Sequence, residues 1–283
     1  MSAIAQSVRL HAAPSRIRRG SALATLTKRR FALTARTPRE IFVPLLTPVL
    51  FAVVIAPALA KTVGAFRPGL DYMTFVAIAT AGLLVPLNTM FSGIGVIVDR
   101  ESGARRDLLA APIPRPLLVF GNLAVALAIT GLQLAALVVA AVLRGANFQT
   151  SAFGVAWAAG AAVLLGVGMY GVAETLANRI PKVEEYIAAT PAIAIVPWFF
   201  AGSLFPIKAL PAALAGFAKV LPLTHALALM RYGLVDRRGL GLRDIWGMHS
   251  TAAMAGLSLV VVGAFAIMMT AVAIRVFTRA AVR

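Results

Sequence analysis

The chain has 283 residues, of which 60% are hydrophobic and 13% charged, and its mean hydropathy is +0.88. Soluble domains are about 45–50% apolar, and several apolar runs here reach the ~18–20 residues needed to cross a bilayer, so the composition predicts a polytopic helical membrane protein. The absence of cysteine excludes disulfides and thiolate metal sites. The net charge is +17, but nine of the 27 basic residues fall in the first 39 positions and most others flank apolar runs. This distribution indicates that the basic residues set the orientation of the chain in the membrane, and it does not indicate a nucleic-acid partner.

The N-terminal region precedes the long apolar runs and is predicted in two parts. Residues 1–20 are basic and without periodicity, which indicates a disordered cytosolic tail. Residues 21–36 predict an interfacial helix, with Leu23, Leu26, Phe31 and Leu33 on one face and Arg30 interrupting that face. We expect residues 37–283 to form a single transmembrane domain.

Six membrane spans follow from the apolar runs. They are predicted at about residues 41–60, 72–98, 117–143, 152–177, 186–204 and 250–274. With both termini in the cytosol, the inner segments hold 18 of the 27 Lys and Arg residues and the outer segments hold nine. This bias favours cytosolic N and C termini in the cell membrane.

Residues 205–233, which precede the last span, do not have the sequence of a typical membrane span. Pro206, Pro211 and Pro222 divide it into apolar pieces that are too short to cross the membrane. We therefore predict re-entrant helices in the outer leaflet. The alternative, in which this segment crosses once, gives seven spans and an external C-terminus.

The most informative stretch, residues 99–115, lies between the second and third spans. Six of its first nine residues are charged, and burying them in lipid would cost about 15–20 kcal/mol. The stretch therefore faces water. We expect a short helix that Ser102 caps, that carries an apolar ridge of Leu108 and Leu109, and that ends at Pro112.

Other motifs offer little chemistry. Gly166, Gly168 and Gly171 fit a G-x-G-x-x-G pattern, but they lie in a predicted span and indicate close helix packing. The sequence lacks a G-x-x-x-x-G-K-[ST] phosphate loop. The histidines His11, His225 and His249 are too far apart to suggest a metal site or a catalytic triad.

Few polar residues lie deep in the spans. Asn88, Asn122 and Gln133 either form interhelical hydrogen bonds or line a substrate path. Glu174 lies near the end of a span, and its role there is either packing or proton relay. A transporter driven by an ion gradient is expected to carry buried acidic groups. Because such groups are scarce here, the sequence argues against an internal energy source. An ion-gradient-driven transporter or channel is therefore kept as the alternative function.

Two motifs resemble the membrane subunits of type-2 ABC exporters, in the daunorubicin-resistance-like branch. The first is the acidic-Arg-Glu-x-Gly stretch at residues 99–103, followed by the leucines, a proline and Arg115. Where that family usually has Thr and an acid, this chain has Ala104, Arg105 and Arg106. The second motif runs from Ser203 to Arg231 and is similar to the family's outer segment before the last span.

The resemblance implies a permease subunit that is not itself an enzyme and binds no cofactor of its own. It pairs with a second permease, identical or homologous, and with two cytosolic ATPase subunits that bind ATP and Mg²⁺. Amphipathic drugs, lipids or polysaccharides are the implied substrates, and efflux of antibiotics is the implied role. The implied ATPase-coupling residues are Asp99, Arg100, Glu101, Gly103, Arg105, Arg106, Asp107, Leu108, Leu109 and Pro112, and the implied outer gate is Pro206, Pro211, Pro222 and His225.

Overall fold

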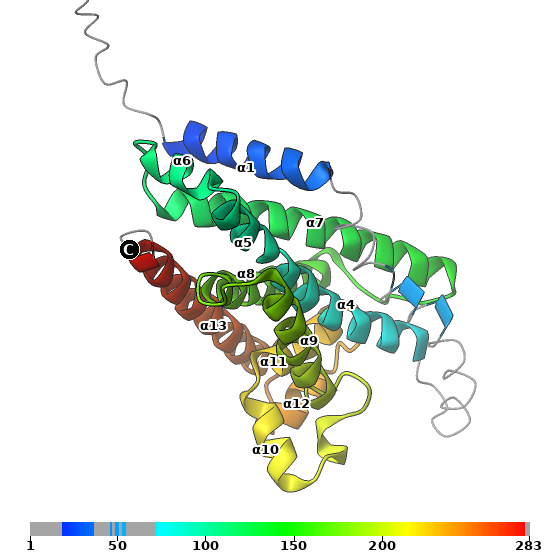
Figure 1. Ribbon diagram of the computed structural model, residues 1–283. Helices are drawn as coiled ribbons and strands as arrows, with labels where there is room; N and C mark the ends of the chain where they lie inside the picture. The colour runs from blue at the N-terminus through cyan, green and yellow to red at the C-terminus, as the bar shows by residue number, and fades with distance from the viewer. Residues whose placement is uncertain (1–18, 37–45, 47–48, 51–52, 55–71, 281–283) are drawn as a thin grey trace, which may run out of the picture.

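The structure is a computed structural model that describes residues 19–36, 46, 49–50, 53–54 and 72–280. Every regular element in these residues is a helix (Figure 1). This architecture, with its long apolar helices, confirms the predicted all-α membrane fold. The predicted tail up to residue 18, and nearly all of the predicted first span at 41–60, lie outside the described residues.

Five helical stretches are long and apolar enough to cross a membrane. They are α4 (Tyr72–Phe91) with α5 (Ile94–Glu101), α7 (Pro116–Leu143), α8 (Ala152–Ala177), α9 (Val183–Phe200) and α13 (Thr251–Ala280). These stretches overlap with the five predicted spans that the structure describes. The shorter helices are α1 (Arg19–Ala35), α6 (Ala104–Ala110), η2 (Ile207–Ala209), α10 (Ala212–Val220), α11 (Pro222–Leu234) and α12 (Leu240–Trp246).

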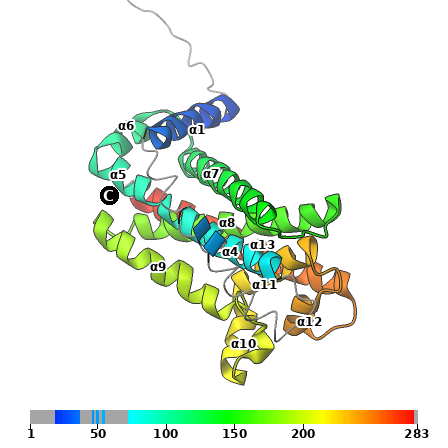
Figure 2. The same ribbon diagram turned by 90° about the vertical axis from the view of Figure 1, so that its right-hand side faces the viewer.

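The short helices gather at two opposite ends of the bundle. Figures 1 and 2 both show α1, α5 and α6 at one end and α10 and α12 at the other. The last turn of α13 reaches the first of these ends, where Arg115 donates from Nη1 to the carbonyl of Thr278 over 3.4 Å. We call the end with α1, α5 and α6 the charged end, and the end with α10 and α12 the far end.

Helix α8 packs against α13, α11 and α4 and so connects the elements of the bundle. The packing is close because α8 carries the glycine motif. A Cβ atom at Gly171 would lie 2.6 Å from the backbone carbonyl carbon of Met269 in α13, and one at Gly168 would lie 3.3 Å from the Cα atom of Ala266. These contacts confirm that the motif serves helix packing.

Helix α1 lies along α7. Ala22 is buried and Leu26 packs near Gly121 of α7. Phe31 and Leu33, by contrast, are 54% and 38% exposed. Two arginines of this helix, Arg29 and Arg30, bind a carboxylate on α5, as described below.

The segment predicted to be re-entrant forms η2, α10 and α11. Helices α10 and α11 meet at Leu221, where their axes are bent by 80°. Pro222 occupies the first turn of α11, where a missing N–H costs nothing. A bend of this size fits either a broken span or a re-entrant loop.

The α8–α13 contact predicts opposite effects for two identical substitutions in one helix. Gly171→Ala should lower stability by about 1–3 kcal/mol, because its methyl group overlaps α13 backbone. Gly160→Ala places the methyl group in open space and should be neutral or slightly stabilising. Thermal unfolding of both variants in detergent measures the difference, and equal midpoints would contradict the packing assigned to α8.

Candidate functional site: the charged end of the bundle

Residues 99–115 form a hairpin between α5 and α7, which we call the charged connection. Its first residues complete α5, and the chain then turns at Gly103, whose φ of +79° favours glycine. The prediction that Ser102 caps the next helix is wrong. Gly103 occupies the cap position of α6, and the Ser102 hydroxyl donates back to the Asp99 carbonyl over 3.5 Å. Helix α6 ends at Ala110, just before Pro112.

Asp99 ties the charged connection to α1. Its two carboxylate oxygens lie 3.3 Å from Arg29 Nη2 and 3.5 Å from Arg30 Nη1. Arg30 also donates to the carbonyl of Gly95 over 3.3 Å. The side chains of Arg30 and Asp99 are only 12% and 13% exposed, so this pair is screened less than a surface ion pair. It explains why Arg30 points inward, and the sequence pattern had not linked these residues.

Arg100 ties the charged connection to the end of α8. Its guanidinium donates to three backbone carbonyls, those of Ala177 at 2.8 Å, Ile180 at 2.9 Å and Pro181 at 2.7 Å. The carbonyls at a helix C-terminus lack partners within the helix and carry partial negative charge. Arg100 therefore fixes the last turn of α8 and the start of the connection to α9.

Arg105 continues the link through a chain of side chains. Its Nη1 donates to Asn178 Oδ1 over 2.8 Å, and Asn178 Nδ2 donates to Glu174 Oε1 over 3.0 Å. The Tyr170 hydroxyl donates to the other oxygen of Glu174 over 2.7 Å. The Arg105 guanidinium also lies 4.8 Å from the centre of the Phe277 ring of α13. Glu174, which the sequence left open between packing and proton relay, is thus part of a hydrogen-bonded network.

Burial lowers the pKa of Arg105, the Glu174 carboxylate acts in the opposite direction, and Arg100 lowers the pKa further. A guanidinium nevertheless stays protonated in proteins. The Arg105 guanidinium therefore keeps its positive charge near the end of α8.

The apolar ridge of α6 lies where the sequence placed it. Leu108, Leu109 and Ile113 pack against a cluster that includes Leu118 of α7 and Phe277 of α13. This contact holds α6 against the long helices while leaving its other side exposed. The charged connection is therefore fixed to α1, α8 and α13 and follows their position.

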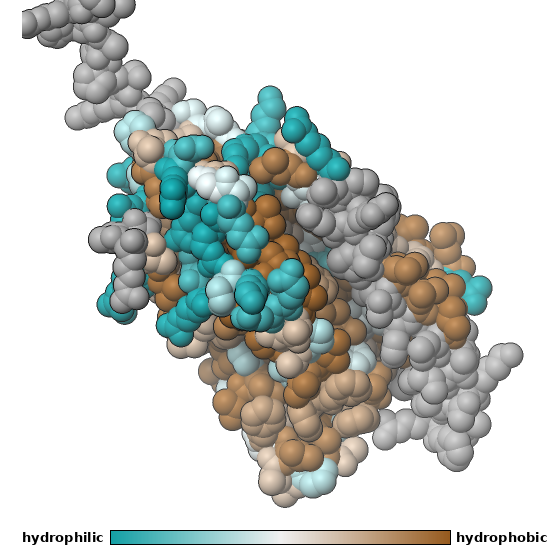
Figure 3. Space-filling view, viewed as in Figure 1, coloured by the Kyte–Doolittle hydropathy of each residue, from teal (hydrophilic) through white to brown (hydrophobic). Residues whose placement is uncertain are grey.

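The side of the charged connection that faces away from the bundle carries three exposed residues, Glu101, Arg106 and Asp107. None of them forms an ion pair with a residue that the structure describes. In Figure 3, hydrophilic residues gather over the charged end, and the remaining coloured surface of this face is mainly hydrophobic. Pro112 and Arg115 are also exposed. The charged end therefore offers a polar surface with unpaired charges of both signs.

The three predicted path residues do not lie together. Asn88 Nδ2 of α4 donates to Gln133 Oε1 of α7, and both side chains are buried. They thus form an interhelical hydrogen bond, one of the two predicted roles. Asn122 instead lines a small recess at the charged end with Arg29 and Arg105.

The predicted gate residues at the far end occupy helix starts. Pro206, Pro211 and Pro222 lie at the starts of η2, α10 and α11 respectively. His225 is buried, with Nε2 2.9 Å from the Lys219 carbonyl and Nδ1 3.2 Å from the Ser258 hydroxyl. The described residues contain no group of three or more metal-ligating side chains.

The fold and this surface define a multi-pass helical membrane protein with a polar, rigidly attached connection at one end. A family model, ABC-2 type transporter, matches residues 21–235. The chain therefore belongs to the ABC-2 type transporter family, whose members are membrane subunits that work with an ATPase partner. A comparison with curated proteins gives no match.

The bonds of Arg100 predict a local effect of its removal. Arg100→Leu should lower stability by about 1–3 kcal/mol, because it leaves carbonyls at the end of α8 unpaired. It should also speed amide hydrogen exchange at residues 177–180 and 182. Arg106→Leu removes an exposed arginine of the same connection and serves as the control. If both variants exchange at the same rate, Arg100 does not hold this end of α8.

Proposed function

We propose that the chain is the permease subunit of an ATP-driven exporter in the cell membrane, with both termini in the cytosol. The main support for this proposal is the charged connection. One side of it is exposed, and the other side is bonded to the helix bundle. Family membership supplies the ATPase partner, and this surface is the place where we expect that partner to bind. ATP and Mg²⁺ would bind to the ATPase.

The bonds of the charged connection suggest how ATP hydrolysis reaches the spans. A force on α6 passes to α1 through Asp99 and to the end of α8 through Arg100 and Arg105. Helix α8 packs against α13, α11 and α4. Because these contacts are close, a displacement of α8 requires its neighbours to move with it. The ATPase would thus change the arrangement of the spans from one end.

The far end then holds the exit. Helices α10 and α11, bent by 80°, would form a re-entrant outer gate, with Pro211 and Pro222 at its bends. Two such permeases, identical or homologous, would pair with two ATPase subunits. Amphipathic drugs, lipids or polysaccharides are the substrates that we propose, which would make the chain part of an efflux or antibiotic-resistance system.

A charge reversal in the charged connection tests the ATPase contact. Arg106→Glu should lower the amount of copurified ABC ATPase and the ATP hydrolysis of the complex by roughly tenfold or more, since like charges at an interface cost several kcal/mol. Arg238→Glu makes the same change at an exposed position outside the charged connection and should have no effect. Copurification in mild detergent with a coexpressed ABC ATPase gives both values.

The result that would contradict the proposal is full binding and hydrolysis in Arg106→Glu, or an equal loss in Arg238→Glu. The alternative, an ion-gradient-driven transporter, predicts transport into vesicles without nucleotide. Glu174, the buried acid of α8, is the group that such a transporter would use, and it is hydrogen-bonded to Tyr170 and Asn178.

A further inference from the structure

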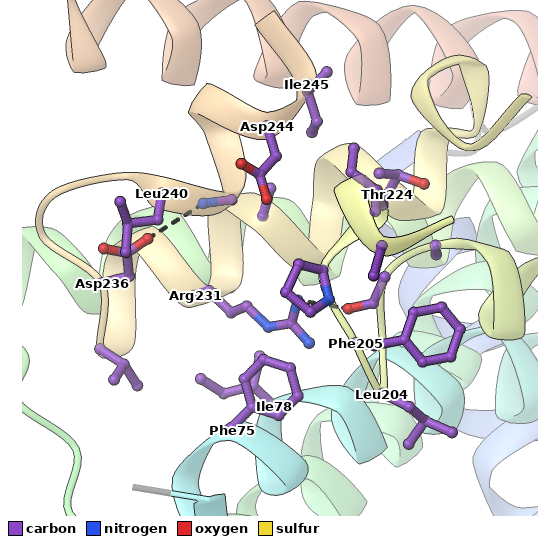
Figure 4. A pocket seen from close by; sticks show the side chains of 18 of the residues that line it. Phe75, Ile78, Leu204, Phe205, Thr224, Arg231, Asp236, Leu240, Asp244 and Ile245 are labelled. Carbon is purple, nitrogen blue, oxygen red and sulfur yellow. Dashed lines mark hydrogen bonds between the residues drawn. The ribbon is translucent and has the colours of Figure 1, made fainter. Parts of the chain in front are cut away.

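A cavity of about 840 Å³ lies at the far end, beside Arg231 of α11 (Figure 4). Its walls are mainly apolar, but they also hold the carboxylates of Asp236 and Asp244. The Asp244 carboxylate lies 2.6 Å from Lys208 Nζ. Charges of both signs are thus present at this cavity, and its lining does not select a ligand by charge.

A groove of about 530 Å³ between α1 and α7 has a different lining. Figures 1 and 2 show the two helices side by side. The walls are mainly apolar and include Leu23, Thr27 and Phe31 of α1 and Val125 and Ala128 of α7. The three α1 residues are four positions apart, so one face of α1 borders the groove. A ligand that fills this groove therefore has a substantial apolar part.

Lys28 gives the groove a positive charge. Among the described residues that line the groove, it is the only charged one. Lys28 is exposed and forms no ion pair with any residue that the structure describes. Helix α7 contains no charged residue, and α1 contains four basic residues and no acid. The groove therefore carries an unmatched positive charge.

The nearest carboxylate in the charged connection is held on another side of α1. Asp99 binds Arg29 and Arg30, which lie about 100° and 200° around the helix axis from Lys28. Asp99 is also not among the residues that line the groove. Helix α1 thus presents two arginines to the charged connection and Lys28 to the groove.

The position of the groove along α7 fits a membrane leaflet. At a rise of 1.5 Å per residue, Val125 and Ala128 lie about 14 and 18 Å from Pro116, where α7 begins. The headgroup region of a leaflet is about 5–8 Å thick, and its hydrocarbon is about 15 Å thick. With Pro116 at the membrane surface, the two residues lie at the depth of the acyl chains. A lysine can bury its stem along apolar surface and still place its ammonium group near the headgroups.

We propose that the groove between α1 and α7 binds an anionic phospholipid. An acyl chain would lie against Phe31, Val125 and Ala128. The phosphate would accept from the Lys28 ammonium group, since basic residues at a membrane surface attract anionic headgroups. The bound lipid would fix α1 to the leaflet and, through Asp99, hold the charged connection at the membrane surface. The site requires no ATPase and is therefore independent of the function proposed above.

Lipid retention by the purified full-length chain tests the charge selection. The chain is placed in nanodiscs that contain equal amounts of phosphatidylglycerol and phosphatidylcholine with the same acyl chains, and retained lipids are counted by native mass spectrometry. The wild-type chain should retain phosphatidylglycerol over phosphatidylcholine by roughly fivefold, the effect of about one basic residue at an anionic surface. Equal retention of the two lipids would overturn the proposal.

Two lysine variants locate the headgroup. Lys28→Gln should lower the retention of phosphatidylglycerol by roughly fivefold. Lys182→Gln changes an exposed lysine at the same end of the bundle but outside the groove, and it should retain lipid as the wild type does. No change in Lys28→Gln, or an equal loss in both variants, would overturn the proposal.

Two tryptophan variants locate the acyl chain. Ala128 is exposed and lines the groove, so Ala128→Trp would fill it and should lower the retention of phosphatidylglycerol by roughly tenfold or more, because each CH₂ group that loses its contact weakens lipid binding. Ala135 is also exposed and lies on the same face of α7, two turns beyond the groove. Ala135→Trp should therefore retain lipid as the wild type does. Wild-type retention in Ala128→Trp would place the lipid elsewhere and overturn the proposal.

Discussion

The hydrogen bonds between Arg100 and the carbonyls at the end of α8 are the interaction on which the account depends. Without them, the charged connection would keep only its contacts to α1, to Asn178 and to the apolar cluster of α7 and α13. With them, and with Asp99 bonded to α1, the connection is joined directly to the end of the central helix. The same bonds satisfy carbonyls that the end of α8 would otherwise leave to water.

The two ends of the bundle differ in the environment that they give to charged side chains. At the charged end, the cost of placing ions in hydrocarbon keeps the connection in water, and its unpaired charges remain available to a protein partner. At the far end, Arg231 is held within an apolar cavity by carbonyls and by an aromatic ring. One end thus presents a polar surface and the other a mainly apolar cavity, and α8 and α11 connect them through close packing.

The sequence predicted the parts of the fold that depend on hydropathy. Five spans and the exposed charged connection follow from run length and charge alone, and the glycine motif of α8 was correctly assigned to packing. Family membership was also visible in the residues at 99–115 and 203–231. These features are local in sequence, so they could be predicted without knowledge of tertiary contacts.

The errors and omissions have a common physical cause. The Arg30–Asp99 pair, the bonds of Arg100 to the carbonyls at and after the end of α8 and the Arg105–Asn178 bond all join residues far apart in sequence, and no periodicity encodes them. The assignment of Ser102 as a cap failed because Gly103, with its left-handed backbone, turned the chain one residue later. The cavity at Arg231 was missed because its walls come from five separate segments.

The sidedness of the charged connection is the most direct test of the account. Because the sequence contains no cysteine, Ser102→Cys and Arg238→Cys each introduce a single thiol at an exposed position. Labelling of intact cells with a membrane-impermeant maleimide should modify residue 238 and leave residue 102 unmodified until the cells are permeabilised. Labelling of residue 102 in intact cells would place the charged connection outside, where no cytosolic ATPase can reach it, and would contradict the account.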